Sequence, residues 1–177
     1  MKLVICEKPS VGAAVAAALG VTGRKDGYIE GNGYLISWCI GHLVQLSEAA
    51  AYGEQYKKWS YDSLPILPQE WQYTVAADKG KQFKILKDLM QRSDVSEVVN
   101  ACDAGREGEL IFRFVYHQAG CKKPFTRLWI SSMETDAIKS GFDNLKDGRE
   151  YDALYHSALC RACLLYTSPS PRDYAAS

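Results

Sequence analysis

Short apolar runs that alternate with helix-type segments are the feature of this sequence that most limits its fold. Runs with strand character at residues 2–6, 96–102 and 125–130 are each followed by a segment typical of a helix. This alternation is typical of a mainly parallel sheet with helices on both faces. We therefore expect an α/β fold whose functional groups gather beyond the carboxyl ends of the strands.

Capping residues and apolar spacing indicate where the helices begin and end. The Ala-rich segment "VGAAVAAALG" has Ser10 in position to cap its start and Gly20 in position to end it. Ser131 and Glu134 have the spacing of a capping box before a later helix. The segment "YDALYHSALCRAC" indicates the start of a further helix. Amphipathic periodicity predicts two more helices, at residues 79–92 and 107–119.

An inserted hairpin interrupts the alternating pattern. In "YIEGNGYLISWCIG", Asn32 and Gly33 stand between two β-type runs, which is the signal of a type I′ turn. Further along, "LPILPQEW" holds two prolines and predicts an extended, irregular surface connection.

Composition narrows the class of protein without naming it. The 177 residues are 47% apolar and 24% charged, which is typical of a globular chain. No apolar run reaches the roughly 20 residues that a membrane-spanning helix needs, and "MKLVICEKPS" is too short for a signal peptide. We expect a cytoplasmic protein. The 21 basic and 21 acidic residues balance, which argues against binding of nucleic acid by bulk charge but leaves a local contact surface open.

The six cysteines do not predict a disulfide framework or a metal cluster. Cys6, Cys39 and Cys102 stand in apolar strand-like runs, where a free thiol behaves as a small hydrophobic side chain. Cys160 and Cys163 have CxxC spacing, but no second pair or histidine cluster accompanies them in the sequence.

Acidic side chains follow two of the expected strands. Glu7 ends the first strand, Asp103 ends a later one, and Glu107 stands in the first turn of the next helix. If the two strands are neighbours, these carboxylates can converge, and such hard oxygen ligands suit Mg²⁺. Lys8 and Arg106 stand beside them and would supply positive charge for a phosphate, as would the N–H groups at the start of the first helix.

Each of these features also has a plainer interpretation. Glu107 and Glu109 are favoured at a helix start by the macrodipole alone, with Arg106 as a surface partner. His42 in "CIGHL" has no histidine near it, so we expect a structural role. Trp59 and Trp71 flank the proline-rich segment and either pack against it or stack on nucleic-acid bases.

Four motifs, in order and spacing, resemble one family. The stretches "EKPS", "WCIGHL", "YKKWSYDSLPILPQEW" and "DAGREGELIFR" are similar to those of the N-terminal Toprim domain of type IA DNA topoisomerases, and of the bacterial topoisomerase III group in particular. The resemblance covers Met1 to about Ala162. It implies a Rossmann-like Toprim domain over residues 1–148 and the truncated start of a helical domain over 149–162. The tail over 163–177 has no family character and no helical periodicity, and we expect it to be disordered or artefactual.

The resemblance also implies an activity and a set of roles. Family members cleave one DNA strand through a tyrosine, pass another strand and reseal the break. Glu7 and Lys8 would be catalytic, Glu7 in proton transfer and metal handling and Lys8 in phosphate contact. Mg²⁺ would be held by Glu7, Asp103 and Glu107. Contacts with single-stranded DNA would come from Lys8, Trp59 and Arg106. No small-molecule cofactor is expected, and we expect a monomer.

Two departures from the family pattern qualify these roles. The family reads Asp-x-Asp-x-Glu at the second acidic site, and Gly105 replaces the second Asp here. The family continues past its Arg-Ala pair into several hundred residues that hold the nucleophilic tyrosine, whereas this chain gives "CLLYTSPSPRDYAAS". Tyr166 in that tail is not expected to be the nucleophile, so this chain alone should not cleave DNA. The alternatives are another Toprim phosphotransfer protein, such as a primase or nuclease, or a phosphate- or DNA-binding module without catalysis.

Overall fold

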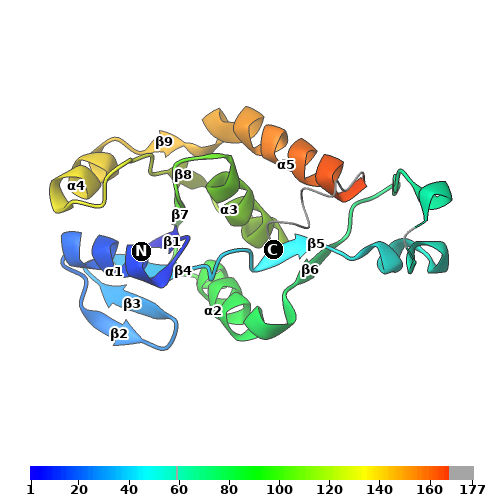
Figure 1. Cartoon of the computed structure of the whole chain (residues 1–177). Helices are drawn as coiled ribbons and strands as arrows, with labels where there is room; N and C mark the ends of the chain where they lie inside the picture. Colours follow the sequence, from blue (N-terminus) through cyan, green and yellow to red (C-terminus); the bar gives the residue numbers. More distant parts are fainter. Residues whose placement is uncertain (59, 168–177) are drawn as a thin grey trace.

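A central sheet with helices on both faces forms the body of the molecule (Figure 1). The computed structural model describes residues 1–58 and 60–167. The strands of this part are β1 (Lys2–Cys6), β2 (Gly23–Lys25), β3 (Tyr28–Gly31), β4 (Tyr34–Trp38), β5 (Val44–Leu46), β6 (Tyr73–Val75), β7 (Glu97–Ala101), β8 (Phe125–Arg127) and β9 (Lys146–Asp147). The α-helices are α1 (Pro9–Ala18), α2 (Gly80–Gln91), α3 (Arg106–Gln118), α4 (Thr135–Asp143) and α5 (Asp152–Thr167). Short 3₁₀ turns lie at Ala49–Tyr52, Glu54–Tyr56, Tyr61–Ser63, Ala77–Lys79 and Gly148–Tyr151.

The middle of the main sheet is parallel, which confirms the predicted α/β class. In the described residues the strand order is β2-β3-β4-β1-β7-β8-β9. β1 pairs in parallel with β4 and with β7, and β7 pairs in parallel with β8. The antiparallel strands β2, β3 and β9 lie at the two sides of the sheet, and β5 pairs with β6 in a separate small sheet.

Successive side chains of the buried strands point to opposite faces of the sheet, so the core has two layers. Leu3 and Ile5 of β1 face α2, α3 and α5, together with buried side chains such as Leu86 and Phe112. Val4 of β1 faces the opposite way, into the layer that α1 and α4 cover, where it packs with Ile138. The chain therefore folds as three layers, helices on sheet on helices, as expected for strands buried on both faces.

The predicted hairpin is present between β3 and β4. Asn32 and Gly33 have φ values of 48° and 81°, the left-handed conformations that a type I′ turn requires, and Gly31 pairs with Tyr34. The chain also leaves α1 at Gly20, as predicted.

Both capping predictions were wrong. Lys8 is the N-cap of α1, and Ser10 lies inside the helix because Pro9, whose fixed φ suits the first helical position, starts it earlier. Glu134 is itself the N-cap of α4, and its backbone N–H donates to Ser132 Oγ at 3.2 Å. The predicted strand at residues 125–130 is shorter and ends at Arg127.

The tail assigned to residues 163–177 is helical in its first part, contrary to expectation. Helix α5 continues to Thr167, while residues 168–177 lie outside the described part of the chain. The end of α5 lacks an amphipathic pattern, and contacts with the rest of the fold stabilise it there. Tyr166 donates a hydrogen bond to Ser47 O at 2.6 Å, and its ring packs edge-on against Tyr52 and Trp71.

Candidate functional site

The carboxyl ends of the parallel strands bring distant segments of the chain to one edge of the sheet. Glu7 and Lys8 follow β1, Asp103 follows β7, and His42 follows β4. From β1 the chain passes through α1, β2 and β3 to β4 on one side of β1, whereas β7 lies on the other side. The order in which strands are added to the sheet therefore reverses at β1. A crevice at such a reversal is where open α/β sheets bind their ligands.

The ammonium group of Lys8 lies close to two carboxylates at this edge. Lys8 Nζ is 3.3 Å from Asp103 Oδ2 and 3.6 Å from Glu7 Oε1. The backbone N–H of Asp103 donates to Glu7 Oε2 at 3.3 Å, which ties the two strand ends together. The pKa of Lys8 is raised, first by its hydrogen bond with Asp103 and then by the negative charges of Asp103 and Glu7. The structure therefore places Glu7, Lys8 and Asp103 in direct contact.

The other predicted site residues are placed less closely or not at all. Glu107 Oε2 lies 3.7 Å from His42 Nε2, and both side chains are about half exposed or more. Arg106 is exposed at the first position of α3. Trp59 lies outside the described residues. Within the described part of the chain, no three His, Cys, Asp or Glu side chains lie close enough together to hold one ion.

The starts of α1 and α3 face the same edge as the three side chains. Among the described residues, neither helix start carries a side-chain cap, so N–H groups at both starts are open to a ligand. Helix N-termini attract anions through these groups and through the macrodipole. The edge thus offers donors for a phosphate beside carboxylates for a cation.

A glycine lets α3 approach the loop of residues 102–105 that joins β7 to α3, called the Asp103 loop below. A Cβ atom at Gly108 would overlap the backbone carbonyl oxygen of Asp103. Gly105 differs, because its φ of 169° is extended and a Cβ there meets nothing within 4 Å. The close contact at Gly108 therefore sets the distance between the helix and the loop.

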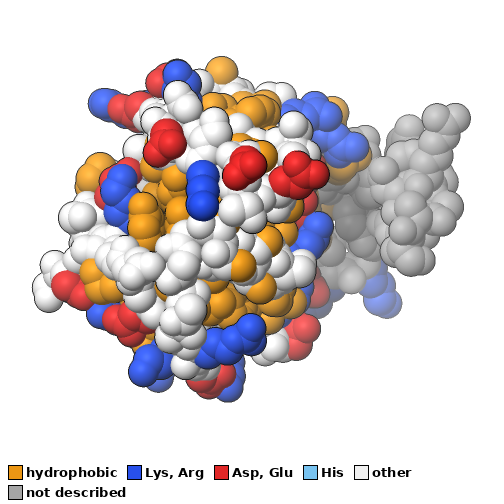
Figure 2. All heavy atoms as spheres, turned by 90° about the vertical axis from the view of Figure 1, so that its left-hand side faces the viewer, with side chains coloured by type: hydrophobic (Ala, Val, Ile, Leu, Met, Phe, Trp, Pro, Cys, Tyr) orange, Lys and Arg blue, Asp and Glu red, His pale blue; other side chains and the backbone are white. Residues whose placement is uncertain are grey.

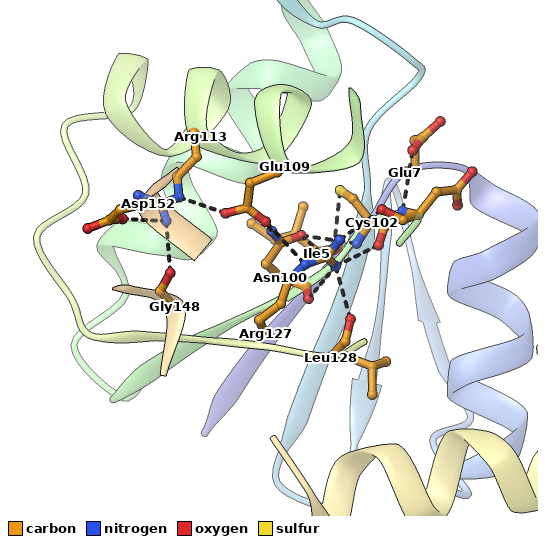
Figure 3. Close-up of polar contacts among 11 residues, drawn as sticks. Ile5, Glu7, Asn100, Cys102, Glu109, Arg113, Arg127, Leu128, Gly148 and Asp152 are labelled. Carbon is orange, nitrogen blue, oxygen red and sulfur yellow. Dashed lines mark hydrogen bonds and ion pairs between the residues drawn. The ribbon is translucent and has the colours of Figure 1, made fainter. Parts of the chain in front are cut away.

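A buried ionic network lies beneath the loop, and Glu109 is at its centre (Figure 3). The plainer interpretation of Glu109, as a helix-start charge with a surface partner, was wrong, because its side chain is fully buried. It accepts hydrogen bonds from Arg113 Nε and from Asn100 Nδ2, each at 2.9 Å, and pairs with Arg127. Burial raises the pKa of the Glu109 carboxyl, and the guanidinium groups of Arg127 and Arg113 oppose this rise.

His42 and the buried arginines were not foreseen as part of the site. His42 is exposed rather than structural in the core, and a sequence signal for it existed, since it follows a strand. Its position after a strand places His42 at the site edge only if β4 is known to run parallel to β1. Arg127, in "TRLWI", carried no comparable signal.

On one face of the molecule, positive and negative side chains are mixed rather than gathered by sign. Figure 2 shows the side that carries α1 and α4, where Lys and Arg side chains are interspersed with Asp and Glu. Among the described helices, none combines the length and apolar character needed to cross a membrane.

The fold is that of a Toprim domain. The Toprim domain family model matches residues 2–133, and the chain belongs to this family. The chain is 49% identical over 161 residues to the DNA topoisomerase 3 of Shouchella clausii (strain KSM-K16), and 45% identical over 160 residues to that of Bacillus subtilis (strain 168). These alignments cover 91% and 90% of this chain, and 22% of each relative. The resemblance to topoisomerase III stated from the sequence is thereby confirmed.

A solved structure confirms the fold. Full-length topoisomerase I from Thermotoga maritima superposes with a TM-score of 0.61 at 19% identity, covering 92% of this chain and 23% of that one.

Proposed function

We propose that this chain supplies the acidic metal- and phosphate-binding site of a type IA DNA topoisomerase of the topoisomerase III group. That enzyme, an isomerase, would cleave and rejoin single DNA strands with Mg²⁺. The contact of Lys8 with both Glu7 and Asp103, at an edge that two helix starts also face, is the observation that carries the proposal.

The donor set suits Mg²⁺. This ion is commonly held by one or two carboxylates, with waters and substrate phosphates completing its coordination. Glu7 and Asp103 provide two carboxylates already in contact with one cation, the Lys8 ammonium. Glu107, now beside His42, is the third candidate ligand. Bound Mg²⁺ would supply neutralisation of charge on the phosphodiester.

Residues of this chain would also bind the phosphate, transfer a proton and contact DNA. Lys8 would bind a non-bridging phosphate oxygen, and Glu7, which is 12% exposed, would hold or release a proton at the leaving oxygen. Arg106 and Trp59 would contact single-stranded DNA. The nucleophilic tyrosine would come from outside these residues. Tyr166 does not suit that role, because its hydroxyl donates to Ser47 O and burial raises its pKa to about 12.

The proposal also covers the location, oligomeric state and cofactor requirement of the protein. We propose a cytoplasmic monomer that needs no organic cofactor. A primase- or nuclease-type Toprim protein would use the same acids but would not need the Trp59 segment. A binding module without catalysis would use the carboxylates only as helix-start charges.

A titration with Mn²⁺, as a paramagnetic substitute for Mg²⁺, separates these possibilities. We expect the wild-type chain to bind and Asp103→Ala to lose binding. Asp136→Ala is the matched control, since Asp136 is an acid in the first turn of α4. Equal binding by the wild type and Asp103→Ala would refute the metal site and favour the binding module.

A second measurement tests the DNA contact. We expect Trp59→Ala to weaken binding of single-stranded DNA, because base stacking on an aromatic ring contributes about 1–3 kcal/mol per base. Unchanged affinity would exclude Trp59 from the DNA surface.

A further inference from the structure

The guanidinium group of Arg127 binds the backbone of the Asp103 loop from below (Figure 3). Arg127 Nη1 donates to Cys102 O at 2.6 Å and to Leu128 O at 3.0 Å, and Nη2 donates to Asp103 O at 2.8 Å. The Arg127 side chain is fully buried. It therefore joins the end of β7, the end of β8 and the start of the loop through a single planar group.

The loop carbonyls need such a donor. Cys102 and Asp103 follow the last residue of β7, where the ladder of the sheet no longer supplies N–H partners. A buried carbonyl oxygen without a hydrogen bond costs about 1–3 kcal/mol. The fork of the arginine satisfies two consecutive carbonyls at once, which a single ammonium group on a flexible stem does less well.

The positive charge of Arg127 is balanced by Glu109, a carboxylate outside the Asp103 loop. Its Nε lies 3.1 Å from Glu109 Oε2 as an ion pair, and Glu109 is shared with Arg113. Arg113 in turn donates to Asp152 Oδ1 and to Gly148 O, each at 2.8 Å. Arg113 and Arg127 thus bind the same carboxylate, but Arg127 alone of the two contacts the loop.

We propose that Arg127 is a positioning residue for Asp103. By fixing the carbonyls of Cys102 and Asp103, it holds the loop so that the Asp103 carboxylate faces Lys8 and Glu7. What the carboxylate then binds rests on the proposed function, whereas the positioning itself does not.

Two matched lysine variants test the proposal in this chain. Arg127→Lys keeps a charge beside Glu109 but loses the fork, and Arg113→Lys makes the same change in the same network away from the loop. We expect Arg127→Lys to weaken Mn²⁺ binding by about tenfold, the lower end of the range found when residues that orient metal ligands are changed. We also expect faster amide hydrogen exchange at residues 103–107. Arg113→Lys should retain wild-type values for both measurements, even if its overall stability falls.

The outcomes separate positioning from a general loss of stability. Wild-type Mn²⁺ affinity and loop exchange in Arg127→Lys would overturn the proposal, as would equal changes in both lysine variants. If Arg127→Lys does not fold, the pair Glu109→Gln with Arg127→Gln removes the Glu109–Arg127 ion pair and leaves Arg113 paired with Asp152. Faster loop exchange is again expected, and wild-type exchange would overturn the proposal. If the wild type binds no Mn²⁺, the proposed metal site fails, while loop exchange still decides the role of Arg127.

Discussion

Lys8 Nζ lies 3.3 Å from Asp103 Oδ2, although the two residues are 95 positions apart in the chain. The parallel pairing of β1 with β7, in which Cys6 lies opposite Ala101, brings them together. Glu7 contacts both, so one ammonium group balances two carboxylates.

Replacing Lys8 by Met should affect cation and DNA binding in opposite directions. Without the ammonium group, Mn²⁺ no longer competes with it for Glu7 and Asp103, and we expect affinity to rise about two- to fivefold, the range of exposed ion pairs. Binding of single-stranded DNA should weaken, with a salt slope shallower by about 0.7 for one lost phosphate contact. Calorimetry and salt-dependent anisotropy measure the two effects. Lys2→Met, which removes a lysine paired with Glu97, is the control, and equal effects there would contradict the assignment.

Gly108→Ala should destabilise the chain, while Gly105→Ala should not. A methyl group at residue 108 collides with the Asp103 backbone, and overpacking of this kind costs about 1–3 kcal/mol. Residue 105 is extended and open, so alanine fits there. Urea unfolding of both variants checks the difference. Similar midpoints for the two would show that the loop moves aside readily.

Glu109→Gln should be among the most damaging single changes in the network. It leaves two buried arginines with one carboxylate fewer, and breaking a buried pair in this way costs about 3–5 kcal/mol. Asp152→Asn also removes a partner of Arg113, but the Asp152 side chain is 48% exposed, so we expect a loss of at most about 1 kcal/mol. Denaturant midpoints should separate the two variants clearly. An equal loss of unfolding free energy in both would contradict the burial of the Glu109 network.

Stability should fall in strong alkali because three buried or half-buried tyrosines resist ionisation in the folded chain. Burial raises the pKa of Tyr73, Tyr116 and Tyr166 from 10.0 to about 12. Below pH 10 all three are protonated in both states and their contribution is fully present. Between pH 10 and about 12 the unfolded chain loses these protons first, so the contribution is lost as pH rises. Ultraviolet titration of the folded chain should show a late class of tyrosines, and one transition near pH 10 in a folded chain would contradict it.

The fold was predictable because its signals are local. Apolar runs of β-type residues, the Asn32–Gly33 turn and the apolar face of α2 each reveal their structure within a few residues. The starts of α2 and α3 lie within one residue of the predicted positions. The starts of α1 and α4 were not predicted, because Pro9 and Glu134, rather than Ser10 and Ser131, mark them.

The site was predictable only in part for the same reason. Glu7 and Asp103 stand next to strand ends, so the parallel sheet alone places them at one edge. The burial of Glu109 depends on its pairing with Arg113, on the same helix, and with Arg127, at the end of β8. No sequence pattern near Arg127 indicates this pairing. Glu107 and His42 lie beside each other because β4 runs parallel to β1, which the hairpin pattern does not reveal.

The central place of β1 has a consequence for synthesis of the chain. β1 leaves the ribosome before both of its partners, because β4 and β7 end only at Trp38 and Ala101. Until residue 101 has emerged, one side of an apolar strand has unpaired N–H and C=O groups, which another nascent chain can join. Chains interrupted before β7 are therefore the ones expected to aggregate, and chaperones would be needed most during that interval.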